Sequence, residues 1–206
     1  MLDPIRTALS MACNLTLAVW MTLCVIHFFT DDSKDAGSRG VNCFRYFTID
    51  SNLLVSAAGI CMMIAEIAAL AGGAPIPEWV YTLKFAGTSA VTVTLLTVLL
   101  FLGLTQGYRK VFANDNLYMH LIGPLIAILS FCFLERGAPI PTSGLIFAVL
   151  PTVVYGAVYL TMVLITQKWE DFYGFNTGGR WYVSMLIVFT SGFGISLLLR
   201  LLHNLG

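Results

Sequence analysis

Long apolar stretches recur along this chain, and they restrict its fold more than any other feature of the sequence. Each is about 20 residues long, which as a helix spans the ~30 Å hydrocarbon core of a bilayer. Charged residues make up only 11% of the chain, against about 25% in a soluble domain. Because backbone groups in lipid must hydrogen-bond within the protein, the stretches predict an all-α bundle of transmembrane helices. We expect six helices, at residues 9–29, 47–71, 79–104, 117–134, 144–166 and 181–202.

The same composition excludes several other classes of protein. These helices leave no separate soluble domain, so residues 1–206 are expected to form a single transmembrane domain. A formal net charge of zero gives no basis for nucleic-acid binding. The five cysteines include no CxxC pair, and their odd number argues against a disulfide framework. The chain is therefore expected to be an integral, multi-pass membrane protein, in the plasma or inner membrane if it is bacterial.

Charged residues near the ends of the helices indicate the orientation of the bundle. Six helices place both chain ends on one side of the membrane, here called face A, and the loops after the first, third and fifth helices on the other, face B. Face B carries seven positive residues, which are Lys34, Arg39, Arg45, Arg109, Lys110, Lys168 and Arg180. Face A carries four, which are Arg6, Lys84, Arg136 and Arg200. Positive residues accumulate on the cytoplasmic side, so the counts favour a cytoplasmic face B. Lys84 and Glu66, both near face A, are expected to pair across the hairpin of the second and third helices.

Polar residues crowd the start of the second predicted helix, at face B, in the sequence FRYFTIDSNLL (44–54). Thr48 and Asn52 lie one turn apart on the same helix face, which predicts that they point toward neighbouring helices. Asp50 and Ser51 lie between them in the chain. In a purely structural interpretation, Thr48 is the N-cap and Asp50 stabilises the first turn through the helix dipole. In the other interpretation, these side chains form part of a functional site.

The fourth predicted helix also begins at face B with polar residues, among them Asn116, and carries His120 one turn inside the span. Pro124 follows four residues later. Proline has no N–H for the carbonyl of His120, and its ring crowds that carbonyl, so we expect a bend there. An ionisable residue within a span indicates a functional site. The alternative is a neutral histidine that bonds to a neighbouring helix.

Thr48 and His120 are expected at a similar depth near face B, and together they suggest a specific chemistry. Threonine becomes a nucleophile only when a base takes its proton, and an imidazole is suited to that role. The two residues therefore predict a nucleophile–base dyad, with the hydroxyl about 3 Å from the ring. The residues expected to support this site or bind its substrate are Asp50, Ser51, Asn52, Asn116, Pro124, Tyr155 and Tyr159.

A metal site is the competing interpretation of the same region. His27, Asp31 and His120 could converge near face B. Many membrane hydrolases that use zinc, however, bring three histidines to one metal, and this chain has only three histidines in all. We therefore expect no metal and no other cofactor.

The strings YFTIDSN (46–52) and NLYMHLIGP (116–124) resemble the androgen-induced gene/androgen-dependent TFPI-regulating protein family and its bacterial relatives, in which FT..SN and H...P strings recur. The resemblance covers most of the chain by topology. It implies a six-span membrane threonine hydrolase that cleaves esters between a fatty acid and a hydroxy fatty acid, with Thr48 as the nucleophile and His120 as the base. It also implies cytoplasmic chain ends, which would place face B outside, opposite to the charge count. Two features have no counterpart in the eukaryotic members of the family: the residues DSN (50–52) and the aromatic connection before the sixth helix.

These observations predict a membrane-embedded hydrolase whose partner is a lipid ester in the bilayer and which cleaves it with Thr48 and His120. Two alternatives remain. One is a non-enzymatic transporter or a small-molecule- or lipid-binding membrane protein, and the other is an acyltransferase, which shares the first chemical step. A pocket closed toward face A and open sideways to lipid would favour the hydrolase. A polar path to both faces would favour transport.

Overall fold

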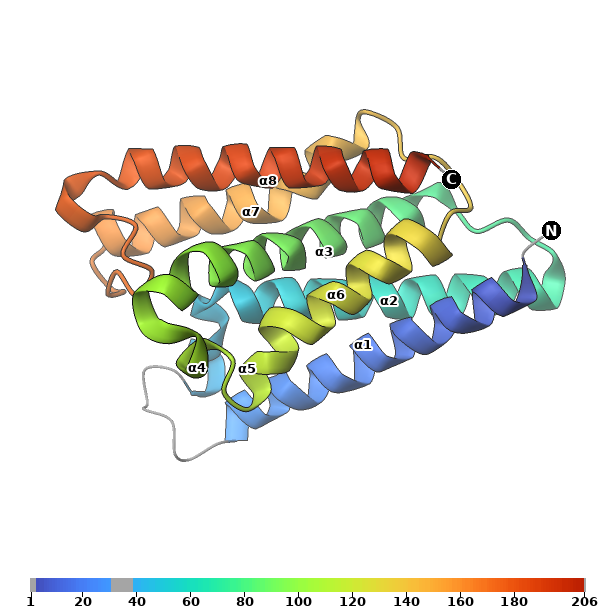
Figure 1. The fold of residues 1–206 in the computed structure, drawn as a ribbon, viewed down its shortest axis with the longest axis horizontal. Helices are drawn as coiled ribbons and strands as arrows, with labels where there is room; N and C mark the ends of the chain where they lie inside the picture. Colours follow the sequence, from blue (N-terminus) through green and yellow to red (C-terminus); the bar gives the residue numbers. More distant parts are fainter. Residues whose placement is uncertain (1–2, 31–38, 206) are drawn as a thin grey trace.

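The computed structural model describes residues 3–30 and 39–205, and these form a bundle of long helices (Figure 1). No strand occurs among these residues. Six helical spans are long and apolar enough to cross a membrane, which confirms the predicted six-helix bundle of a multi-pass membrane protein. The spans are Pro4–Thr30, Phe47–Gly72, Glu78–Val111, Asp115–Leu134, Gly144–Ile165 and Trp181–Asn204. Both chain ends lie at the same end of the bundle, as an even number of crossings requires (Figure 1).

Three of the six spans are interrupted by wide turns, in which an N–H bonds to the carbonyl five residues earlier. The α-helices are α1 (Pro4–Thr30), α2 (Phe47–Gly72), α3 (Glu78–Thr97), α4 (Tyr108–Val111), α5 (Asp115–Leu117), α6 (Gly123–Leu129), α7 (Gly144–Leu160) and α8 (Trp181–Asn204). The wide turns are Val98–Gly107, Tyr118–Ile122, Ser130–Leu134 and Thr161–Ile165, and short 3₁₀ helices occupy Gly40–Arg45 and Thr177–Gly179. Asp31 and Lys34, which entered the expectations above, lie outside the described residues.

Two helix ends lie more than two residues from the positions predicted by hydropathy. The first helix begins at Pro4 rather than at residue 9, because Asp3 caps it: its carboxylate accepts the N–H groups of Ile5 and Arg6 at 3.0 and 3.3 Å. Proline suits the first helical position because it needs no hydrogen bond there. The third span runs seven residues beyond the predicted residue 104, to Val111. This extension matters for the site described below.

The third span is the central helix of the bundle. In its most apolar window 72% of the residues are buried, against 22–44% in the other five spans. Figure 1 shows α3 between α2 on one side and α7 and α8 on the other. Gly87 allows α2 to approach closely, since a side chain at this position would come within 2.8 Å of the Val55 Cα. The central helix α3 therefore packs closely against α2, the helix that carries Thr48.

Toward face A, the bundle buries a charged cluster whose pairing differs from the prediction. Lys84 does not pair with Glu66. Its Nζ lies 3.2 Å from a Glu135 carboxylate oxygen, and both side chains are fully buried. Asn14 bonds to both members of this pair, and the Ser130 hydroxyl donates to the same Glu135 oxygen at 2.5 Å. The cluster joins α1, α3 and the end of the fourth span, and it fixes these three helices to one another at this end of the bundle.

Candidate active site

The helix boundary at α2 argues against Thr48 as an N-cap. Tyr46 occupies the N-cap position and Thr48 is the second helical residue. The Thr48 Oγ1 instead lies 3.3 Å from the Nε2 of His120 on the fourth span. This distance is close to the value of about 3 Å expected for a hydroxyl and its base. The first N–H of α2, from Phe47, donates to the phenol oxygen of Tyr173 at 3.1 Å, so a residue distant in sequence satisfies the helix start.

The second ring nitrogen of His120 determines its tautomer. His120 Nδ1 lies 2.7 Å from the backbone carbonyl oxygen of Val111, the last residue of the third span. A carbonyl oxygen can only accept a hydrogen bond, so Nδ1 must carry the proton. The Nε2 atom of the neutral ring is then an acceptor that faces the Thr48 hydroxyl. His120 as a whole is 8% exposed, so it is buried within the bundle.

The fourth helix has a wide turn where Pro124 predicted a bend. The wide turn Tyr118–Ile122 contains His120 and ends where α6 begins, with Pro124 in the first turn of α6. The N–H of Gly123 reaches back to the carbonyl of Tyr118, one residue further than in an α-helix. Since Pro124 has no N–H, the α-helical bonding pattern cannot run unbroken through this point. Wide turns of this kind are frequent at functional sites.

Asn52 and Ser51 hold the backbone around Thr48. The fully buried amide of Asn52 donates to the carbonyl of Thr48 at 2.7 Å and to that of Met119 at 3.2 Å, so it joins α2 to the residue preceding His120. The Ser51 hydroxyl lies 2.9 Å from the Thr94 hydroxyl on α3 and donates to the Thr48 carbonyl at 3.2 Å. Both predicted supporting residues therefore contact the segment that carries Thr48.

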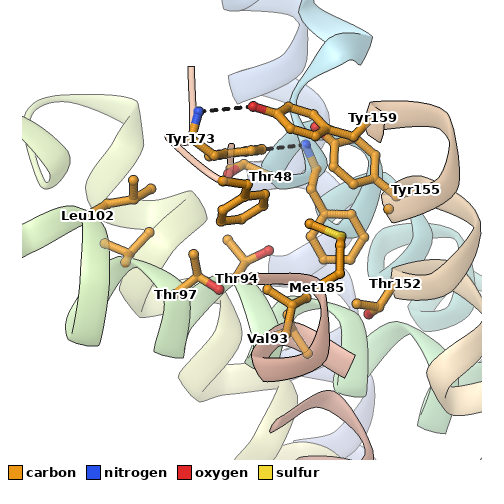
Figure 2. A pocket seen from close by; sticks show the side chains of 15 residues that line it. Thr48, Val93, Thr94, Thr97, Leu102, Thr152, Tyr155, Tyr159, Tyr173 and Met185 are labelled. Atoms are coloured by element: carbon orange, nitrogen blue, oxygen red, sulfur yellow. Dashed lines mark hydrogen bonds between the residues drawn. The ribbon is translucent and has the colours of Figure 1, made fainter. Parts of the chain in front are cut away.

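Thr48 lines a narrow pocket between α2, α3, α7 and α8, here called the inner pocket, with a cavity volume of about 40 Å³. Figure 2 shows Thr48 on the same side of it as Tyr155, Tyr159 and Tyr173, with Thr94, Thr97, Val93 and Met185 on the opposite side. Most other lining side chains are apolar, and they are Phe47, Val98, Leu102, Phe175 and Val188. The predicted Tyr155 and Tyr159 thus lie in the same pocket as Thr48.

The aromatic connection before α8 covers the inner pocket, whose lining includes Tyr173 and Phe175. Asp171 holds it in place by accepting the Tyr159 hydroxyl at 2.7 Å and the N–H groups of Phe175 and Asn176 at 2.9 and 2.8 Å. The N–H of Tyr173 donates to the Tyr159 hydroxyl at 3.2 Å (Figure 2). Desolvation raises the pKa of Tyr173 to about 12, so its phenol remains protonated at neutral pH. In the sequence, the only indication that this connection has a role was its high proportion of aromatic residues.

The other predicted site residues lie apart from the Thr48–His120 pair. Asp50 lines a second cavity, between α2 and α7, here called the outer pocket. Asn116 lies in α5 and is half-buried, and its backbone N–H bonds to the carbonyl of Ala113 at 3.1 Å. His27, from the metal alternative, contacts the carboxylate of Asp115. Within residues 3–30 and 39–205, no three His, Cys, Asp or Glu side chains are arranged to hold a metal ion.

Comparison of the chain with protein-family models, with curated proteins and with solved structures finds no match. Fold and geometry together describe a multi-pass helical membrane protein with a threonine hydroxyl and a neutral imidazole in contact beside a largely apolar pocket.

Proposed function

We propose that this protein is a membrane-embedded hydrolase that cleaves a lipid acyl ester by means of Thr48 and His120. The observation that carries the proposal is the pair of contacts made by the His120 ring. Its Nδ1 is fixed on the Val111 carbonyl at 2.7 Å, and its Nε2 faces the Thr48 hydroxyl at 3.3 Å. A nucleophile, its base and a group that orients the base are the recurring parts of an activated hydroxyl.

The proposed reaction proceeds through an acyl-enzyme. Thr48 Oγ1 attacks the ester carbonyl carbon while His120 Nε2 takes the hydroxyl proton. The ester C–O bond then breaks, and the imidazolium returns this proton to the leaving alkoxide, which departs as an alcohol. A water molecule, deprotonated by the same nitrogen, attacks the acyl-enzyme and releases the fatty acid and the free Thr48 hydroxyl. The Val111 carbonyl stabilises the imidazolium formed in each step, since its partial negative charge lies 2.7 Å from Nδ1.

A lipid substrate is supported by the surroundings of the pair. The inner pocket is lined mainly by apolar and aromatic side chains, and it lies inside the membrane-spanning bundle. The sequence resemblance favours an ester of a fatty acid with a hydroxy fatty acid. The pocket reaches no deeper into the bundle than the level of Val93 and Thr152. Toward face A from there, the core is filled by buried side chains such as Phe85 and Phe131, which favours a hydrolase over a transporter.

The proposal is tested by labelling with a fluorophosphonate probe, which reacts with activated hydroxyls. We expect Thr48→Ala and His120→Ala each to abolish labelling, and Thr48→Ser to retain part of it. Thr97→Ala is the matched control, because Thr97 lines the same pocket and, within the described part of the chain, its hydroxyl forms no hydrogen bond with a histidine. It should label like the wild type. Loss of a helix cap would cost only ~1 kcal/mol of stability and would leave labelling intact.

Equal labelling of the wild type and Thr48→Ala would refute the proposed nucleophile. Hydrolysis and acyl transfer are separated by adding a long-chain alcohol to the assay. A hydrolase releases free fatty acid as its main product, whereas an acyltransferase forms a new ester in its place.

A further inference from the structure

The outer pocket lies between α2 and α7 and has a cavity volume of about 270 Å³. Its lining is mainly apolar and consists of Phe44, Phe47, Asp50, Ser51, Leu54, Pro151, Val154, Tyr155, Val158 and Trp169. Val154 and Val158 are 53% and 46% exposed on a membrane-spanning helix, so this cavity is bordered by the lipid-facing surface of the bundle. An acyl chain is the ligand that such a surface meets in a bilayer.

Of the residues that the structure describes, two line both the outer pocket and the inner pocket, and they are Phe47 and Tyr155. Their ring centroids are 5.0 Å apart, so the two rings stand side by side in the wall between the cavities. The Tyr155 hydroxyl donates to the backbone carbonyl of Arg45 at 2.6 Å, which fixes its ring. Phe47 directly precedes Thr48 in the chain. One pair of rings therefore separates the lipid-facing cavity from the candidate nucleophile.

The volumes of the two cavities show that the inner pocket must widen before a lipid can react at Thr48. At about 40 Å³, the inner pocket has room for about three water molecules, at roughly 10–15 Å³ each. It cannot accept an acyl chain with the rings in their present positions. The outer pocket, at about 270 Å³, is close to the ~300 Å³ lower bound of ordinary ligand sites.

We propose that the outer pocket is the entrance for the acyl chain of a membrane lipid ester, and that Phe47 and Tyr155 form the gate between it and Thr48. This inference rests on the proposed hydrolase activity. The gate opens when the Tyr155 hydroxyl leaves the Arg45 carbonyl and the two rings separate. The chain then passes from the bilayer between α2 and α7, and its ester carbonyl reaches the Thr48 hydroxyl.

A third cavity provides an internal control for this route. It lies between α1 and the fourth span, has a volume of about 140 Å³, and is lined by Thr16, Leu17, Trp20, Met21, Tyr118, Ile122, Gly123 and Ile126. It shares no lining residue with the inner pocket. Ile126 lines only this cavity and Leu54 lines only the outer pocket, and both are half-buried aliphatic residues. Replacing either by tryptophan adds the same indole group to a different cavity.

The experiment measures the ratio of two hydrolysis rates for the full chain reconstituted in phosphatidylcholine vesicles. One substrate is a long-chain oleoyl ester in the bilayer, and the other is a short, water-soluble butyrate ester. We expect Leu54→Trp to lower the ratio of long-chain to short-chain rates about tenfold, and Ile126→Trp to leave it within about twofold. Tyr155→Phe keeps the ring but loses the bond to Arg45, worth ~1 kcal/mol, and should raise the ratio about three- to fivefold. Leu54→Phe is the milder variant if Leu54→Trp does not fold.

The gate is refuted if neither Leu54→Trp nor Tyr155→Phe changes the ratio of long-chain to short-chain rates. It is also refuted if Ile126→Trp lowers this ratio as far as Leu54→Trp does. Failure of the proposed function gives a different result. In that case the wild type hydrolyses neither ester, or Thr48→Ala hydrolyses both as fast as the wild type.

Discussion

At the scale of single residues, the amide of Asn52 is notable because it bonds to a backbone carbonyl on each of the two segments that carry Thr48 and His120. One bond goes to Thr48 itself and the other to Met119, which precedes His120. Neither bond involves a reacting atom. Asn52 therefore acts as a positioning residue that sets the distance from the hydroxyl to the imidazole.

We expect Asn52→Leu, which has a similar volume but no amide, to slow fluorophosphonate labelling of Thr48 about ten- to a hundredfold, because the loss of two buried hydrogen bonds lets the segments separate. Asn116→Leu is the matched control, since it removes the same kind of amide from a residue that lies apart from the Thr48–His120 pair and lines neither the inner nor the outer pocket. It should label within about twofold of the wild type. If the two variants were equally slow, the role assigned to Asn52 would be wrong.

The sequence was sufficient to select Thr48 and His120, because polar groups near the start of apolar spans are costly and easily recognised. It could not reveal Val111. That residue contributes a backbone carbonyl, which every residue possesses, and it lies in the stretch beyond residue 104 that hydropathy left outside the third helix. Tyr173 was missed for a related reason. Its contact with the start of α2 depends on how the aromatic connection folds back, and no local pattern records that.

At the scale of helices, the buried pair of Lys84 and Glu135 determines how the central helix meets the fourth span. The sequence led us to expect Lys84 to pair with Glu66, because the two residues lie on helices that are neighbours in the chain. The centre of the bundle instead brings α3 against the end of the fourth span. The six helices themselves were predictable because span length follows from bilayer thickness. Which helix occupies the centre depends on packing among all six, and hydropathy does not carry that information.

We expect Lys84→Met to destabilise the folded protein by ~3–5 kcal/mol, because it leaves the carboxylate of Glu135 buried without its cation. Lys110→Met is the control, since Lys110 is exposed on α4 and its replacement should cost less than ~0.5 kcal/mol. The double variant Lys84→Met/Glu135→Leu should recover part of the loss, as it removes both charges. Thermal unfolding in detergent measures all three. A Lys84→Met variant as stable as Lys110→Met would contradict the assigned pair.

At the scale of the whole molecule, the structure sharpens the argument about orientation. Lys84 was counted among the four positive residues of face A, yet it is fully buried and paired, so it does not act as a loop charge. The count of seven to four therefore becomes seven to three in favour of a cytoplasmic face B. With that orientation, Thr48 lies near the inner leaflet, and the proposed lipid substrate would reach it from the cytoplasmic side of the membrane.

A membrane-impermeant maleimide applied to intact cells tests this orientation. Ala74 and Thr177 are exposed residues in loops at opposite faces, A and B. We expect Ala74→Cys to react from outside and Thr177→Cys to react only after the cells are opened. The wild-type protein, which has five native cysteines, gives the background labelling to be subtracted. The reverse pattern would place the termini in the cytoplasm, as the family resemblance implies.

The carbonyl of Val111 has a consequence for genetics. In many hydrolases a carboxylate orients the catalytic histidine. A mutational scan detects that carboxylate residue, because replacing it lowers the activity. In the proposed site, the group that orients the histidine is a main-chain carbonyl. A substitution at residue 111 changes the side chain and leaves the carbonyl in place, so an alanine scan would detect Thr48, His120 and Asn52 but not the group that bonds to His120 Nδ1. That group would stay invisible to any survey that compares side chains alone.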